Sequence, residues 1–165
     1  MILPRSVVCS VDFYDASSGA LRYAAVVANY FHAELTVLTV TDPLLTEAAE
    51  PSGASAHLPE AVNKELLRFV KKSFEGGVTP ENMKLTVATG KPAVEILRTA
   101  KERPADLVVM STHGLTGMRK LFFGSTTERV LRETTVPVLL IPAHDHGPAR
   151  VEDVKSAVKR MLIPV

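Results

Sequence analysis

Five short apolar runs alternate with segments of helical periodicity along this chain of 165 residues. The apolar runs lie at residues 5–11, 35–40, 83–88, 106–110 and 136–141. Between them, apolar residues recur at helical spacing in residues 15–32, 60–74, 90–103 and 124–132. Strands that alternate with helices are joined by right-handed crossovers into a parallel sheet. The sequence therefore predicts an α/β fold: a three-layer, open, twisted five-stranded parallel sheet with helices on both faces.

The ends of these strands are where a ligand is expected. In an open parallel sheet, ligands bind beyond the carboxyl ends of the strands, where the strand order reverses. The residues at those ends are Ser10, Val11, Asp12, Val40, Thr41, Met110 and Ser111. Asp15 and Ser17 follow closely and are expected to cap the first helix.

A loop rich in glycine and hydroxyl groups follows the fourth apolar run. It reads Ser111-Thr112-His113-Gly114, then nine residues, then Gly124-Ser125 at the start of a helical segment. Glycines let a backbone approach a phosphate closely, and the first turn of a helix offers unpaired N–H donors and a partial positive charge. Two interpretations remain open: a phosphate site, or glycines that only shape a loop. Arg119 and Lys120 either add charge to such a site or are solvated.

This loop resembles the nucleotide-binding motif of ATP-binding universal stress proteins. Two further segments are similar to that family: Ser10-Val11-Asp12-Phe13 at the end of the first run, and Gly90-Lys91-Pro92 before the third helical segment. The resemblance covers about residues 3–142. It implies a Rossmann-like fold of the adenine nucleotide α-hydrolase-like type. It also implies ATP as the ligand, accompanied by Mg²⁺ on the phosphate oxygens.

The resemblance implies a role for each matching position. Asp12 would lie close to the adenosine, Val11 would line the pocket beside it, and Met110 would lie nearby. The backbone of Val40 would recognise the adenine edge.

The phosphate side of the implied site comes from the loop and the helix after it. Gly114 would admit the phosphates. The phosphate tail would be bound through backbone N–H groups and hydroxyls of Gly124, Ser125, Thr126 and Thr127. One position departs from the family pattern, because Ser111 stands where the first loop glycine is expected. Serine would weaken the site if that position required a positive φ.

Charge and cysteine content narrow the classes of function. With 19 basic and 18 acidic residues, the formal charge of +1 gives no indication of a nucleic-acid or membrane-surface partner. The single cysteine, Cys9, excludes an internal disulfide, and a cytoplasmic location is expected. No apolar run reaches membrane-spanning length. No base or nucleophile accompanies His113, so no catalytic residue is predicted.

The expected function is that of an ATP-binding protein in stress response or regulation, whose nucleotide state modulates interactions with partners or within a dimer. A homodimer is expected through the fifth run, which begins at Val136 and ends at Ile141, because that run would otherwise leave an open sheet edge. An unidentified protein partner is also expected. Two alternatives stay open: a weak ATPase or adenylate-transferring enzyme on the same fold, and an adaptor with an empty pocket.

The sequence predicts two parts: a universal stress protein-like nucleotide-binding domain, residues 1–142, and a C-terminal extension, residues 143–165. Residues 143–150 are predicted to be a linker, with His144-Asp145-His146 as a polar stretch and not a metal site. A basic and then apolar run ends the chain. It is interpreted as an added strand of the sheet, a strand that pairs with another subunit, or the first strand of a second copy. Residues 44–56 are predicted to form a surface loop.

Overall fold

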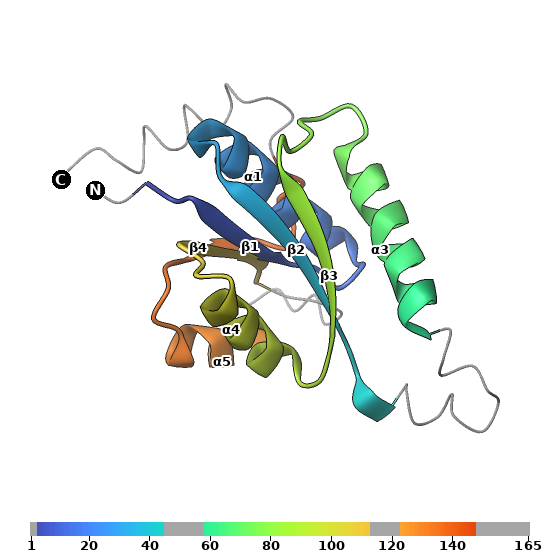
Figure 1. The fold of residues 1–165 in the computed structure, drawn as a ribbon, viewed down its shortest axis with the longest axis vertical. Helices are drawn as coiled ribbons and strands as arrows, with labels where there is room; N and C mark the ends of the chain where they lie inside the picture. Colours follow the sequence, from blue (N-terminus) through green and yellow to red (C-terminus); the bar gives the residue numbers. More distant parts are fainter. Residues whose placement is uncertain (1–2, 45–57, 113–122, 148–165) are drawn as a thin grey trace.

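The computed structural model describes residues 3–44, 58–112 and 123–147. Its elements follow the predicted alternation, and Figure 1 shows them as a sheet between two layers of helices. The strands are β1 (Ser6–Ser10), β2 (Glu34–Thr41), β3 (Met83–Thr89), β4 (Leu107–Ser111) and β5 (Val138–Ile141). The helices are α1 (Asp15–Phe31), α3 (Leu58–Phe74), α4 (Pro92–Glu102) and α5 (Ser125–Glu133). The predicted α/β class with a five-stranded sheet is confirmed.

All five strands are parallel, in the order β3-β2-β1-β4-β5. From β1 the chain first builds outward through β2 to β3, and then crosses to the other side of β1 to add β4 and β5. The strand order therefore reverses between β1 and β4. A crevice forms at such a point because the crossover segments leave the two neighbouring strands in opposite directions.

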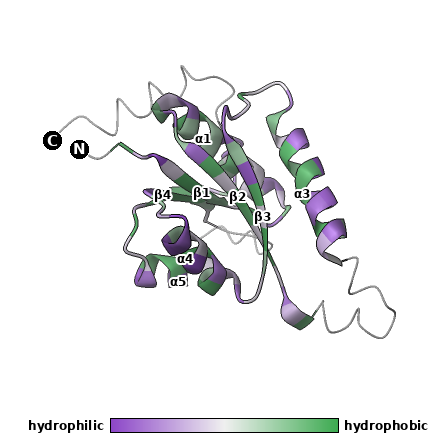
Figure 2. Ribbon diagram, viewed as in Figure 1, coloured by the Kyte–Doolittle hydropathy of each residue, from purple (hydrophilic) through white to green (hydrophobic). Residues whose placement is uncertain are grey.

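Two hydrophobic cores cover the two faces of the sheet. Along β1, Val7 and Cys9 face the core shared with α1 and α3, whereas Val8 faces the core shared with α4 and α5. This alternation follows from the two-residue period of a strand. Both faces of β1 are apolar because helices cover both. The helices themselves carry hydrophobic and hydrophilic surfaces, as Figure 2 shows for α3 and α4.

The segment after β5 contacts α1. Residues 143–150 are predicted to form a linker, and within this segment Asp145, His146 and Gly147 pack against α1. The hydroxyl of Tyr23 donates a hydrogen bond of 2.9 Å to the Asp145 carboxylate. These contacts are with a helix more than 120 positions earlier, which no local pattern reveals, and the division of the chain at residue 142 stays a prediction. The three interpretations of the final run, and the predicted loop from residue 45 on, lie outside the described residues.

Candidate functional site

A cavity of about 330 Å³ lies at the carboxyl ends of the strands, at the point where the strand order reverses. Its size is in the range of pockets that hold small molecules. The wall combines the ends of β1, β2 and β4 with the first turns of α1, α4 and α5. The predicted site residues on this wall are Val11, Asp12, Val40, Met110, Gly124, Ser125, Thr126 and Thr127. Positions spread over more than 110 residues of sequence thus line one cavity.

The loop between β1 and α1 is held by a short hydrogen-bond network. The Asp12 carboxylate accepts a bond of 3.2 Å from the Tyr14 N–H, while the Ser17 hydroxyl accepts from the Asp12 N–H and donates to the Tyr14 carbonyl. Phe13 sits between them with φ of 66°, a left-handed conformation that costs a non-glycine residue free energy. The network fixes Asp12 at the cavity and leaves it further acceptor sites.

The predicted caps of α1 are wrong. Tyr14 occupies the N-cap position without a side-chain hydrogen bond to the helix. Ser17 lies inside the first turn, and its hydroxyl bonds back to the Tyr14 carbonyl and to the Asp12 N–H. Composition alone could not separate these roles, because the short polar side chains of a helix start can bond either to the helix or to the loop before it.

Val40 directs its backbone polar groups toward the cavity. The Leu38 carbonyl accepts from the Val11 N–H on the β1 side, whereas the Thr41 carbonyl accepts from the Gly90 N–H on the β3 side. Backbone groups of successive residues in a strand point to opposite neighbours, so Val40 faces the same side as Leu38. The β1 register ends with Ser10 opposite Leu38. The N–H and carbonyl of Val40 therefore lie beyond the end of β1, where the cavity opens.

The start of α5 forms the opposite wall. Gly124 is the N-cap, and because it has no side chain, no side-chain cap closes the first turn. Its N–H donates to the Thr112 carbonyl at 3.1 Å, and its own carbonyl accepts from Glu128 at 2.9 Å. The buried Thr127 hydroxyl donates to the Ser111 carbonyl at 3.2 Å, which ties the helix to the end of β4. The first-turn N–H groups of Ser125 and Thr126 follow at the cavity wall.

Within the described residues, neither the backbone nor the packing requires glycine at position 124. Its φ of −61° and ψ of 156° suit any residue. A Cβ built there would meet the Thr112 carbonyl oxygen at 3.8 Å, an ordinary contact. No packing contact within the described residues therefore accounts for the absence of a side chain at position 124.

Ser111 does not carry the backbone strain that its departure from the family pattern suggested. It is the last residue of β4 and pairs with Ile141 of β5. The non-glycine residues with positive φ in the described part of the chain are Phe13 and His32. Serine at this position therefore costs no left-handed conformation.

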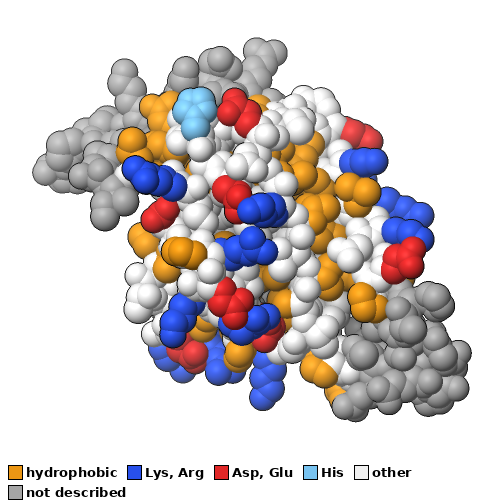
Figure 3. Space-filling model, in the orientation of Figure 1, with side chains coloured by type: hydrophobic (Ala, Val, Ile, Leu, Met, Phe, Trp, Pro, Cys, Tyr) orange, Lys and Arg blue, Asp and Glu red, His pale blue; other side chains and the backbone are white. Residues whose placement is uncertain are grey.

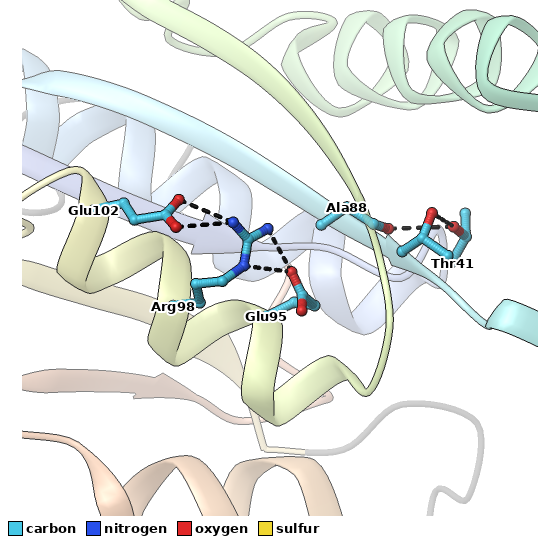
Figure 4. A network of polar contacts seen from close by, with 6 residues as sticks. Thr41, Ala88, Glu95, Arg98 and Glu102 are labelled. Carbon is cyan, nitrogen blue, oxygen red and sulfur yellow. Dashed lines mark hydrogen bonds and ion pairs between the residues drawn. The ribbon is translucent and has the colours of Figure 1, made fainter.

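Gly90 and Lys91 join β3 to α4. Gly90 has φ of 151°, and a Cβ there would lie 3.0 Å from the Glu95 side chain, so both backbone and packing favour glycine. Arg98 forms two ion pairs: Nη2 lies 2.6 Å from a carboxylate oxygen of Glu95, and Nη1 lies 2.9 Å from a carboxylate oxygen of Glu102 (Figure 4). The two carboxylates raise the pKa of Arg98. Pro92, the first residue of α4, lies at the cavity wall.

The cavity is poor in charged side chains. Among its described lining residues, Asp12 is the one carboxylate, and lysine, arginine and histidine are absent. Positive potential on this wall comes from the amino-terminal end of α5. The visible outer surface carries both signs of charge interspersed (Figure 3). Within the described residues, no group of three or more histidine, cysteine or acidic side chains could hold a metal ion.

Comparison with known proteins identifies the family. The model of the universal stress protein family matches residues 4–142. The chain belongs to the universal stress protein family. It is 34% identical over 143 residues to universal stress protein MJ0531 of Methanocaldococcus jannaschii, a match that covers 84% of this chain and 82% of that protein. It is 36% identical over 135 residues to a universal stress protein of Thermus aquaticus, covering 78% and 93% of the two chains.

Solved structures share the fold of this universal stress protein. The structure of MJ0577 matches with a TM-score of 0.70 at 22% identity, covering 86% of this chain and 97% of that one. A universal stress protein in complex with cAMP matches with a TM-score of 0.65 at 22% identity, covering 86% and 99%. The universal stress protein of Archaeoglobus fulgidus in complex with dAMP matches with a TM-score of 0.58 at 22% identity, covering 86% and 99%. None of the helices in the described ranges has the length and apolarity needed to cross a membrane.

The predicted site is brought together in large part by this fold. Gly114, Arg119 and Lys120 lie outside the described residues, so their placement stays a prediction. Sequence reasoning did not assign Tyr14 or Ser17 to the cavity wall, although both line it. The sequence contained a sign of this role, because both residues follow the end of β1 closely, in the segment that leads into α1 at the point where the strand order reverses.

Proposed function

We propose that this universal stress protein binds ATP in the cavity at the strand ends. The observation that carries the proposal is Gly124, whose backbone angles and described packing suit any residue and which leaves the first turn of α5 without a side-chain cap. A phosphate could there approach the backbone N–H groups of the first turn, where the helix dipole favours an anion. The two structural neighbours in complex with cAMP and dAMP support an adenine nucleotide as the ligand.

Each part of the nucleotide has a matching wall. The backbone N–H and carbonyl of Val40 offer a donor and an acceptor for the adenine edge, with Val11 and Met110 as apolar neighbours. The Asp12 carboxylate would accept a ribose hydroxyl. The N–H groups and hydroxyls of Ser125 and Thr126 and the N–H of Thr127 would bind the phosphate tail, and Gly124 and Gly114 would admit it, since the Gly124 N–H donates to Thr112 and the Thr127 hydroxyl to Ser111.

The negative charge of the phosphates must be balanced by groups outside the described wall. Because that wall holds no cationic side chain, we infer that Mg²⁺ accompanies ATP on the phosphate oxygens and that Arg119 and Lys120 add charge. Binding without rapid turnover fits a wall with one carboxylate, since the described lining offers no second group to act as a base. In this proposal the nucleotide state acts in stress response or regulation through partner or dimer interactions in the cytoplasm.

The test is calorimetric titration of ATP, AMP and cAMP into the wild type and Gly124→Val. We expect ATP affinity to fall at least about tenfold in the variant, which corresponds to ~1.4 kcal/mol of binding free energy. AMP and cAMP should lose less, because each carries one phosphate. Gly77→Val is the matched control: a Cβ there meets the Phe74 carbonyl oxygen at 3.8 Å, as at Gly124, but Gly77 lies after α3, away from the cavity. Undiminished ATP affinity in Gly124→Val would overturn the assignment.

Dimerisation through β5 is the second part of the proposal. Within the described residues, β5 pairs with β4 alone and forms one edge of the sheet. The Pro137 carbonyl accepts a hydrogen bond from Val108 of β4, and the Ile141 carbonyl accepts one from Thr112, the residue directly after β4. The alternating residues Val138 and Leu140 therefore direct their backbone groups away from β4. Such an edge can pair with a second copy of this chain.

A further inference from the structure

A second cavity, of about 240 Å³, lies between α1, α3 and the segment after β5. It shares one wall with the first cavity, because the loop before α1 presents alternate residues to each. Asp12 and Tyr14 line the first cavity, whereas Phe13 and Asp15 line the second. The rings of Phe13 and Phe69 pack edge to face, with their centroids 5.7 Å apart, and form the apolar side of the second cavity.

Residues 145–147 complete this cavity by packing closely on α1. A Cβ on Gly19 would overlap the Asp145 carbonyl oxygen, so only glycine allows the segment to approach the helix. The Asp145 carboxylate accepts bonds of 2.9 Å from the Tyr23 hydroxyl and from the Gly147 N–H. This contact holds His146 at the cavity wall.

The polar side of the cavity is positively charged. Arg22 is half-buried, and its bonds of 2.6 Å and 3.3 Å go to the carbonyls of Ser73 and His146, which are neutral acceptors. Lys72 also lines the cavity. In residues 3–44, 58–112 and 123–147, no ion pair joins either cation to a carboxylate. Asp15 is the one acidic residue of the described lining.

The Ser73 hydroxyl adds a neutral donor beside these cations. Ser73 is 2% exposed, and its hydroxyl accepts a bond of 3.0 Å from Ser18. A half-buried guanidinium that is bonded to carbonyls alone is stabilised further when an anion reaches it, because charge-assisted bonds are stronger than neutral ones. The cavity thus presents donors and positive charge to whatever enters it.

We infer that this cavity binds the phosphoryl group of a small organic phosphate monoester. A phosphate dianion can accept bonds from Arg22, Lys72 and the Ser73 hydroxyl at once, even with Asp15 on the wall, whereas a carboxylate supplies half of that charge. The volume is below that of most drug-sized pockets, so the organic part must be small. The aromatic side formed by Phe13 and Phe69 would contact that organic part.

The experiment is an NMR titration of the whole chain with inorganic phosphate at constant ionic strength, with acetate as the second arm. We expect saturable shifts of the amide signals of Ser18, Gly19 and Ser73 with phosphate, and weak, non-saturating shifts with acetate. Lys72→Gln should weaken phosphate binding at least about fivefold, a loss of ~1 kcal/mol. Lys71→Gln is the matched control, since Lys71 carries the same charge on the same helix but does not line the cavity.

Two more variants separate this site from the nucleotide site. Gly124→Val should leave the shifts at Ser18 and Ser73 unchanged, whereas Gly19→Ala should abolish them by displacing residues 145–147. Phosphate shifts confined to the first turn of α5, equal affinity in both lysine variants, or an equal response to acetate would each overturn the inference. None of these outcomes bears on ATP binding in the first cavity.

Discussion

Replacement of Thr36 by valine is expected to stabilise the protein. Thr36 lies in the middle of β2, opposite Val8 of β1 and Lys84 of β3, and is fully buried. Its hydroxyl oxygen is the one buried side-chain polar atom in the described chain without a hydrogen-bond partner. Burial of an unpartnered hydroxyl costs about 1–3 kcal/mol. Valine has nearly the same shape and the same β-branch, so the strand conformation is preserved.

Two contributions raise the free energy of unfolding of Thr36→Val. Removal of the hydroxyl recovers part of its desolvation cost, and the new methyl group adds up to ~0.8 kcal/mol of apolar burial. We expect the free energy of unfolding to rise by about 1–2 kcal/mol. For a chain of this length, that corresponds to a rise in Tm of roughly 2–8 °C. Urea unfolding followed by circular dichroism measures the change, with the m value expected to stay constant.

The matched control is the same substitution at Thr127, in protein free of nucleotide. Thr127 is also buried, but its hydroxyl donates to the Ser111 carbonyl. Thr127→Val should therefore lower the free energy of unfolding by about 0.5–1.5 kcal/mol. If Thr36→Val left stability unchanged or reduced it, the hydroxyl would have a partner in solution and the reasoning would fail.

Three further predictions concern the core, a turn and the sheet edge. Burial raises the pKa of the Cys9 thiol, so the native protein should resist a thiol reagent at pH 8; reaction at the rate of the unfolded chain would contradict this. Above about pH 9 the Cys9 thiol ionises in the unfolded chain but not in the native protein. The stability that its burial contributes should therefore be complete below that pH and decrease above it. Gly90→Ala should cost about 1 kcal/mol or more in urea unfolding, because φ is 151° and Glu95 occupies the space; an unchanged midpoint would refute it. Val138→Pro should convert the proposed dimer to monomer in sedimentation while the β4 ladder persists; a dimer that persists in the variant would exclude β5 as the interface.

Most of the fold could be predicted because its signals are local. Each predicted strand agrees with its observed bounds to within about two residues. The third run, residues 83–88, is one residue shorter than the observed strand Met83–Thr89. Strand–helix alternation leaves few topologies, so the carboxyl ends of β1, β2 and β4 could be placed together before the structure was known.

Contacts between distant segments could not be predicted. The packing of Asp145 on Gly19, and with it the second cavity, joins positions more than 120 residues apart. The left-handed conformation of Phe13 is likewise maintained by its surroundings, since nothing in a phenylalanine side chain favours it.

The sequence by itself determined the alternation of elements, the apolar faces of the strands and the residue types at the strand ends, because periodicity and turn chemistry are properties of neighbouring residues. Only the tertiary structure decided that a Cβ on Gly124 would make an ordinary contact with the Thr112 carbonyl oxygen, that the backbone groups of Val40 lie beyond the end of β1, and that the Thr36 hydroxyl has no partner among the described residues. These depend on which atoms of distant segments come within a few ångströms. Such distances follow from packing of the whole chain.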